Sequence, residues 1–352
     1  MRDTPDKRNY QRSCSIVVRD RVVNKILSAA RTRGRYCSQK GLGKSIIDTK
    51  VIFWLFFILT EGTTGCVIFL IMAIKILKAS GLPEDFDTRK LANSLIRSGT
   101  PADVANNIAE EVAKKVVPST KTREIYRLAK RLLRQYNIAA GMRYSLKKAI
   151  SELGPTGYPF EKYFARVLQN HGYSTEVGRV INGYCVQHEV DILAKSGNEH
   201  FVIECKYHSN GGKPTDVKVA LYVSSRFNDI KKAFELTPEH SLDVHQGWLV
   251  TNTRCTADAI KYAECVGLRI ISWRYPEAGS LEKMIEERRL YPITVLPSAR
   301  KKSLETLFAN NFILAQDIAD MDENSFVGKS GIDHITASAI KREADKICPC
   351  TL

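Results

Sequence analysis

Apolar and polar side chains alternate along HFVIECKYH, residues 200–208, and a period of two is typical of a β-strand. The residues of one face are Phe201, Ile203, Cys205 and Tyr207. The other face places a carboxylate, Glu204, and an amine, Lys206, between two histidines. A half-buried strand with such a polar row is either a salt-bridge ladder on a solvated sheet face or part of a chemical site.

The hydrophobic pattern on both sides of this strand predicts an α/β domain. A helix is expected over 159–171, followed by strands over 173–180 and 184–194 with a turn at Asn182-Gly183. Next come the strand 200–208, a long helix over 215–236, the strand GWLVTNT, the helix TADAIKYAECVG and the strand LRIISW. The order α-β-β-β-α-β-α-β closes on a βαβ unit and predicts a mixed central sheet flanked by helices.

The segments that flank this domain have helical periodicity. Residues 74–137 begin with a short strand and a turn, and continue with three helices, the first starting at the N-cap Asp87. The C-terminal stretch is helical in period and broken at Gly328 and Gly331. The expected divisions of the chain are a basic and apolar extension (1–71), a small mainly helical domain (72–137), a linker (138–158), the α/β domain (159–297) and a helical hairpin domain (298–352).

The extension contains an apolar run, VIFWLFFILTEGTTGCVIFLIMAI, over residues 51–74, whose length suits a membrane helix. EGTTG interrupts its middle, and an acid such as Glu61 is costly at the centre of a bilayer. Three interpretations stay open: a membrane anchor, a buried hairpin of two apolar strands, or a segment outside the working protein, which would then start at Met72. A membrane is a partner only if the anchor is real.

Net charge adds a class of partner. The chain of 352 residues has a formal charge of +15, which favours a polyanion such as nucleic acid or a membrane surface. Residues 1–71 hold 13 basic and 5 acidic residues, so the remainder, at +7, is only mildly basic. The nine cysteines are odd in number and lack a regular spacing, which argues against a secreted disulfide scaffold and favours a reduced, cytoplasmic protein.

The polar row of the strand 200–208 gains a chemical meaning from Asp191, which lies near the end of the preceding strand, 184–194. If the two strands pair across the short turn between them, Asp191 and Glu204 meet beside Lys206. Two carboxylates and the backbone carbonyl of Cys205 are oxygen ligands that suit Mg²⁺ or Mn²⁺. A metal there would shield a phosphodiester and acidify a water molecule, while Lys206 orients that water or stabilises the transition state. Glu189, on the same face as Asp191, is the alternative ligand.

Asp191 followed by Glu204-x-Lys206 on this frame resembles the PD-(D/E)xK nuclease superfamily, in particular its Mrr-like restriction endonucleases. GWLVTNTRCTADAIKYAECVGLRIISW is similar to the closing βαβ unit of that branch, and the likeness covers residues 155–275. The resemblance implies a metal-dependent DNA endonuclease of restriction or DNA repair, with Glu161 of the first helix as an additional acidic residue. The branch often has Gln where Glu204 stands. Cutting two strands usually needs a symmetric pair of sites, so a homodimer is expected.

Residues 73–137 resemble the ATP-cone, a regulatory nucleotide-binding domain of ribonucleotide reductases and their repressors. The likeness is carried by KASG, where the family has Lys-Arg-Asp-Gly, by FDTRKL and by KTREI. It implies that ATP or dATP binds as an allosteric ligand, with Lys78 and Lys90 at the phosphates. Ala79 replaces the usual Arg and removes one phosphate contact. The alternative is that both lysines are solvated surface residues of a helical bundle.

The C-terminal run from Gly331 to Ala344 resembles a helix-hairpin-helix, in which a glycine turn directs backbone N–H groups at DNA phosphates. A packed helical pair used for dimerisation is the alternative. The complete sequence predicts a metal-dependent DNA endonuclease controlled by nucleotide binding. Two other functions stay open: a non-catalytic, nucleotide-sensing DNA-binding regulator on a nuclease scaffold, and an ATP-cone protein whose basic surface binds RNA.

Overall fold

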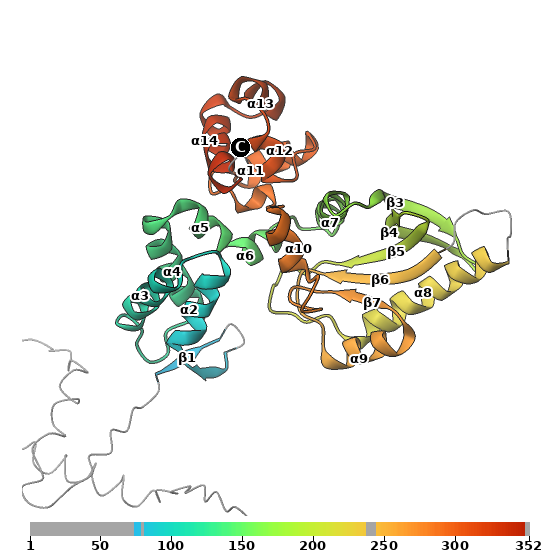
Figure 1. Ribbon diagram of the computed structural model, residues 1–352, viewed down its shortest axis with the longest axis horizontal. Coiled ribbons are helices and arrows are strands. Elements are labelled where there is room, and N and C mark those ends of the chain that lie inside the picture. The colour runs from blue at the N-terminus through green and yellow to red at the C-terminus, as the bar shows by residue number, and fades with distance from the viewer. Residues whose placement is uncertain (1–73, 79–80, 237–243, 349–352) are drawn as a thin grey trace, which may run out of the picture. The chain divides into compact units, whose positions relative to one another are not determined.

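The computed structural model describes residues 74–78, 81–236 and 244–348 (Figure 1). The extension 1–71, almost all of the apolar run 51–74, and Ala79 lie outside these residues, so their interpretation stays a prediction. Within the described ranges, no helix combines the length and apolar character needed to cross a bilayer.

A β-hairpin and three helices form the N-terminal part of the described chain. These elements are β1 (Lys75–Leu77), β2 (Pro83–Asp85), α2 (Thr88–Arg97), α3 (Ala102–Ala113) and α4 (Thr122–Tyr136). Asp87 caps α2 as predicted, because its carboxylate accepts the backbone N–H of Arg89 at 2.8 Å. Each helix turns small or aliphatic residues inward, including Leu95, Ala109 and Leu133, all fully buried. This part of the chain therefore has a hydrophobic core of its own.

The segment expected to be a linker folds into two short helices, α5 (Ile138–Arg143) and α6 (Leu146–Ile150). Its apolar side chains are not solvated. Met142, Leu146 and Ile150 are at most 3% exposed and belong to the same buried cluster as Phe160 and Phe164 of α7 (Tyr158–Asn170). Residues 138–153 therefore contribute to the main core rather than only connecting two domains.

The main part of the fold is a mixed five-stranded sheet in the order β3-β4-β5-β6-β7. The strands are β3 (Ser174–Asn182), β4 (Gln187–Ser196), β5 (Glu199–Lys206), β6 (Val244–Thr251) and β7 (Arg269–Ile271). The neighbours β3–β4 and β4–β5 pair antiparallel, whereas β5–β6 and β6–β7 pair in parallel. With α8 (Val217–Glu235) and α9 (Ala257–Val266) they reproduce the predicted order of elements, which confirms the restriction-endonuclease-like α/β fold.

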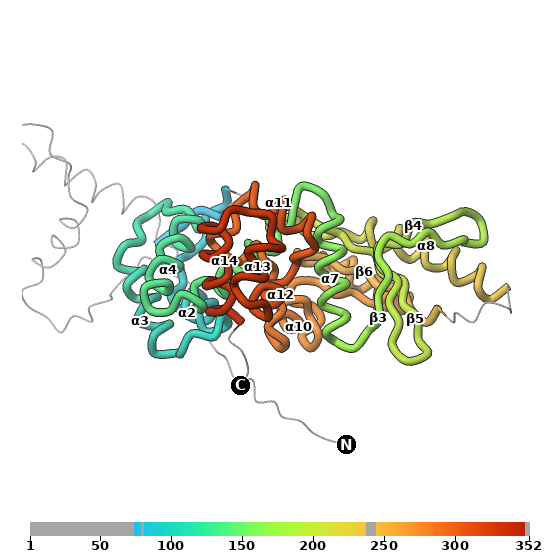
Figure 2. Tube along the Cα trace, turned by 90° about the horizontal axis from the view of Figure 1, so that it is seen from above, coloured from blue at the N-terminus to red at the C-terminus, as the bar shows by residue number. Residues whose placement is uncertain are grey.

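Helices cover both faces of the sheet, and β5 is buried on both sides (Figure 1). Phe201 and Ile203 pack with α7, which lies against β3 and β4 (Figure 2). Val202 points the other way and packs with Ile230 of α8. The expectation of a half-buried strand is therefore wrong: a strand between two neighbours in a flanked sheet is central, and only its end escapes burial.

Six helical elements follow the sheet: α10 (Leu281–Arg288), η1 (Ile293–Val295), α11 (Lys301–Ala309), α12 (Ala315–Ala319), α13 (Glu323–Ser330) and α14 (His334–Ile347). The last three pack together (Figures 1 and 2). Gly331 ends α13 in the left-handed region with φ of 70°, as the predicted break requires. Gly328 lies inside α13, so the break predicted there is wrong. Phe326 and Ile340 join the main core, which is continuous from α5 to α14.

Candidate active site at the end of β5

Asp191 occupies an irregular point of the sheet. Val190 packs on the α8 side of the sheet, while Ile192 packs on the α7 side, although alternation should place both on one face. The paired residues Val177–Ile192 and Arg179–Val190 bracket Asp191 and, on β3, Gly178, whose φ is 68°. The β4 backbone therefore turns at Asp191 and carries its carboxylate away from the core.

This turn brings Asp191 to the end of β5. Its Oδ2 accepts the backbone N–H of Cys205 at 2.7 Å. The antiparallel register ends at the pair Ile192–Ile203, so Asp191 and Glu204 are the residues of β4 and β5 that directly follow the last paired position at this end. The expectation that these two carboxylates meet across paired strands agrees with this geometry. They lie at the carboxyl end of the parallel strands, the edge where α/β sheets usually bind ligands.

Glu204 is held by Arg226 of α8. Nη1 of Arg226 lies 2.5 Å from Oε2 of Glu204, and Nη2 donates to the backbone carbonyl of Glu189. The guanidinium also stacks on the Tyr222 ring, with its carbon 5.3 Å from the ring centroid. Glu204 therefore pairs with a helix cation and not with Lys206, so the salt-bridge ladder is not what the strand forms. The two residues are 22 positions apart in the sequence, and no local pattern indicates their pairing.

Three carboxylates form one electrostatic cluster. Burial, and then the neighbouring Asp191, raise the pKa of Glu204 to about 7, although Arg226 opposes this. Burial followed by the charges of Asp191 and Glu189 raises the pKa of Glu161, in the first turn of α7, to about 7. Burial also raises the pKa of Asp191, against the N–H of Cys205. The charge of Glu161 is thus coupled to those of the two strand carboxylates, and its role in the site stays a prediction.

Lys206 and Cys205 have opposite environments at this strand end. Lys206 is the last residue of β5; its side chain is exposed and makes no hydrogen bond or ion pair with the described residues. Its positive charge nevertheless acts on both carboxylates, because it partly opposes the rise in the pKa of Glu204 and of Asp191. The Cys205 side chain is buried in the main core, and burial raises the pKa of its thiol far above the ordinary value. Its sulfur is therefore turned away from the carboxylates, and only its backbone is available to them.

The donor set suits a hard divalent cation. Among the described side chains, no group of three or more His, Cys, Asp or Glu residues forms a preassembled metal cluster. Two carboxylates, Asp191 and Glu204, do converge here, and the pKa of Glu204 is raised first by burial and then by the charge of Asp191, so a cation beside them would stabilise their charged forms. Oxygen ligands of this kind fit Mg²⁺ or Mn²⁺ better than softer metals.

The other acidic and imidazole candidates have different neighbours. Glu189 has an exposed side chain, and its backbone carbonyl is the group that Arg226 contacts. His188 Nε2 lies 2.7 Å from Asp229 Oδ2 on α8. His208 is buried, and its Nε2 lies 3.0 Å from Thr215 Oγ1. Both histidines thus have partners within the fold.

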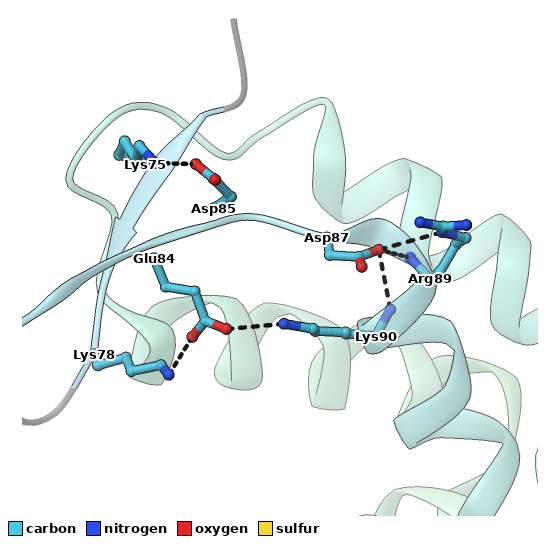
Figure 3. Close-up of polar contacts among 7 residues, drawn as sticks. All are labelled: Lys75, Lys78, Glu84, Asp85, Asp87, Arg89 and Lys90. Carbon is cyan, nitrogen blue, oxygen red and sulfur yellow. Dashed lines mark hydrogen bonds and ion pairs between the residues drawn. The ribbon is translucent and has the colours of Figure 1, made fainter. Parts of the chain in front are cut away.

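A second candidate site lies in the N-terminal hairpin (Figure 3). The ammonium groups of Lys78 and Lys90 converge on the carboxylate of Glu84, with N–O distances of 2.6 and 2.9 Å. The hydrogen bonds from Lys78 and Lys90 lower the pKa of Glu84. The two predicted phosphate-binding lysines therefore lie side by side, around an anion that the sequence had not singled out.

The five-stranded sheet and its flanking helices have a restriction-endonuclease-like fold. Residues 154–276 match the family model of the restriction endonuclease domain, Mrr_cat, and residues 291–348 match that of the AF1548-like C-terminal domain. An uncharacterized protein of Archaeoglobus fulgidus is 34% identical over 183 residues, which cover 52% of this chain and 98% of the relative. The chain belongs to the family of that archaeal protein. The restriction endonuclease match of residues 154–276 in this chain implies DNA as substrate.

Two solved structures are also similar. The crystal structure of AF1548, a protein of unknown function, shares 32% identity and covers 55% of this chain and 98% of its own, with a TM-score of 0.47. The structure of Can2 from Sulfobacillus thermosulfidooxidans in complex with cyclic tetra-adenylate shares 16% identity, with a TM-score of 0.27. It covers 38% of this chain and 34% of that protein.

Proposed function

We propose that the protein is a metal-dependent DNA endonuclease that hydrolyses phosphodiester bonds at the end of β5. The observation that carries the proposal is the convergence of Asp191 and Glu204 beside the exposed Lys206, whose amine pairs with none of the described side chains. The restriction endonuclease match over the same residues supports it, since this domain type is associated with nuclease activity. Restriction or DNA repair is the expected setting.

Asp191, Glu204 and the backbone carbonyl of Cys205 would hold Mg²⁺ or Mn²⁺ in this proposal. The cation, when bound, would neutralise phosphate charge and lower the pKa of a water molecule. The Lys206 ammonium would donate to the attacking water or to a phosphoryl oxygen, since it is exposed and not engaged by any described side chain. Glu161 would accept a hydrogen bond from water on the α7 side of the site.

Plasmid cleavage tests the catalytic proposal. The full chain is incubated with supercoiled DNA and Mg²⁺, Mn²⁺ or EDTA, beside Asp191→Asn, Glu204→Gln and Lys206→Ala. Glu189→Gln is the matched control, because its carboxylate is exposed and adjacent on the same strand. We expect cleavage only with metal, loss in the three variants and retention in the control. DNA binding with no cleavage under any metal would instead favour the non-catalytic regulator.

We further propose that ATP or dATP binds at the N-terminal hairpin and regulates cleavage. Support comes from the two ammonium groups around Glu84, where a carboxylate stands in for an anionic group such as a phosphate. Regulation requires that the nucleotide bind two states of the protein with different affinity. The cleavage assay with and without ATP measures this directly. A cytoplasmic homodimer, and DNA phosphate contacts at Gly331, complete the proposal.

A further inference from the structure

The helix α4 has an unusually basic outer surface. Its sequence TREIYRLAKRLLRQY contains one acid, Glu124, and five cations: Arg123, Arg127, Lys130, Arg131 and Arg134. Its apolar residues Ile125, Ala129 and Leu133 are buried in the core of the helical domain. The helix therefore exposes a positive face by virtue of its packing, and we call Arg127, Lys130, Arg131 and Arg134 the α4 basic face.

These cations form no ion pairs with the described residues, in contrast to other cations of the same domain. Lys75 pairs with Asp85, and both Lys114 and Lys115 pair with Glu111. No residue of the α4 basic face makes an ion pair within the described parts of the chain. Neighbours three and four positions apart on a helix repel when they carry like charges. The face thus concentrates like charges that form no ion pair within the described residues, which favours an external anion.

The α4 basic face also has a shape that can receive a ligand. A shallow depression of 590 Å³ is lined by Arg127, Lys130, Arg131, Arg134, Gln135 and Ile138. Partial burial, and then the charges of Lys148 and Arg134, lower the pKa of Lys130, so this amine already experiences the field of its neighbours. Positive potential and concavity coincide here.

We propose that the α4 basic face binds the phosphate backbone of duplex DNA, away from the site at the end of β5. Arg127 and Arg134 are seven residues apart, or about 10 Å along the helix axis. One DNA strand presents about three phosphates over such a length. Arginine matches this partner, because its planar fork binds phosphate oxygens in pairs.

The packing of α4 argues against a lipid surface as the partner. A helix that binds a membrane inserts its apolar face among the acyl chains, whereas Ile125, Ala129 and Leu133 are already buried. The choice of DNA over RNA rests on the proposed function, because the nuclease domain implies a DNA substrate. Backbone contacts of this kind add affinity but no sequence preference.

DNA binding by the full chain in EDTA tests the proposal without cleavage. The variant is Arg127→Gln/Lys130→Gln/Arg131→Gln, and the control of equal charge change is Lys75→Gln/Lys114→Gln/Lys115→Gln, whose lysines are paired. With a labelled duplex of about 30 base pairs, the variant should lose about tenfold or more in affinity near physiological salt. Its slope of log affinity against log salt should fall by about 2 to 3, one unit for each lost phosphate contact. The control should change affinity less than about threefold.

Three results would overturn the proposal. Equal weakening in variant and control would reduce the effect to net charge. Unchanged DNA affinity, with binding to other polyanions also unchanged, would exclude the surface as a binding site. Unchanged DNA affinity with a loss of binding to duplex RNA or to phosphatidylserine vesicles would assign the surface to that other partner. Arg131→Gln alone, expected to lower the salt slope by about 1, provides the same test if the triple variant unfolds. If the protein does not cleave plasmid DNA but its DNA binding still depends on the α4 basic face, the proposed function is refuted and the proposal for this surface is retained.

Discussion

Nη1 of Arg226 lies 2.5 Å from Oε2 of Glu204, so a guanidinium from α8 balances a carboxylate of the candidate site. The two side chains are only 15% and 23% exposed. A carboxylate in such surroundings needs a positive neighbour, because burial, together with the charges of Asp191 and Glu161, raises the pKa of Glu204 to about 7 even with Arg226 in place. The pair therefore links the stability of the metal-free protein to the proposed metal site.

Arg226→Gln should destabilise the protein in EDTA, and Mg²⁺ should restore part of the lost stability. Leaving Glu204 without its partner should cost about 1–3 kcal/mol in the free energy of unfolding. A divalent cation at the two carboxylates would supply the missing positive charge, so it should stabilise the variant more than the wild type. Urea unfolding with EDTA and with Mg²⁺ measures both quantities.

Arg179→Gln is the matched control for this measurement. Its partner Glu176 is on the same strand, and the two side chains are 60% and 57% exposed, so the pair contributes little. The expected change is less than about 1 kcal/mol and independent of Mg²⁺. Equal stabilisation of Arg226→Gln and wild type by Mg²⁺ would show that no cation binds beside Glu204.

Lys206→Ala should abolish cleavage without affecting the fold. The side chain is exposed and unpaired among the described residues, so its removal should change the free energy of unfolding by less than about 0.5 kcal/mol. A lost proton donor or charge at the reacting phosphate should lower the cleavage rate about 100-fold or more. Single-turnover cleavage and DNA affinity in EDTA separate the two effects. A large loss of affinity with an unchanged rate constant at saturation would make Lys206 a binding residue only.

The order of elements could be predicted because its signals are local. The alternation around Ile203, the Asn182-Gly183 turn and the N-cap Asp87 each depend on neighbours in sequence. Asp191 and Glu204 could be brought together for the same reason, since a short turn joins their strands. Local patterns of this kind determine which strand ends meet.

Contacts between distant elements could not be predicted. Arg226 follows Glu204 by 22 residues and reaches it only when α8 packs on the sheet. The two short helices α5 and α6 could not be predicted for a related reason, because their apolar side chains are buried only through contact with the main core. Gly328 was misjudged because packing of Phe326 on one face of α13 tolerates a glycine in the same helix.

Glu84→Gln should tighten nucleotide binding. The carboxylate of Glu84 holds both Lys78 and Lys90, so a phosphate must compete with it for the two ammonium groups. Removing that competitor should lower the Kd for ATP or dATP about threefold to tenfold, whereas Lys90→Ala should raise it. Isothermal titration calorimetry measures the change.

Asp85→Asn is the control for charge, because Asp85 pairs with Lys75 in the same hairpin at 2.5 Å. It removes one negative charge from β2 without releasing Lys78 or Lys90, so the Kd should change less than in Glu84→Gln. Weaker binding in Glu84→Gln would mean that Glu84 positions the lysines for the nucleotide instead of competing with it.

The two glycines of α13 provide a paired test of the C-terminal turn. Gly331 has φ of 70°, and a Cβ there would lie 2.8 Å from Nδ2 of Asn310 and 3.1 Å from Cγ2 of Thr306. Gly331→Ala should therefore destabilise the protein by about 1–2 kcal/mol, since an L-residue is strained in this region and must also displace its neighbours. Gly328 is helical, and a Cβ added to it meets no atom within 4 Å. Gly328→Ala should stabilise the protein by up to about 1 kcal/mol, because alanine favours the helix. Urea unfolding distinguishes the two directions.

The same two variants test DNA contacts at this turn. DNA affinity reduced by Gly331→Ala but not by Gly328→Ala, with both proteins folded, would support phosphate contacts there. Equal affinities would favour the packed helical pair.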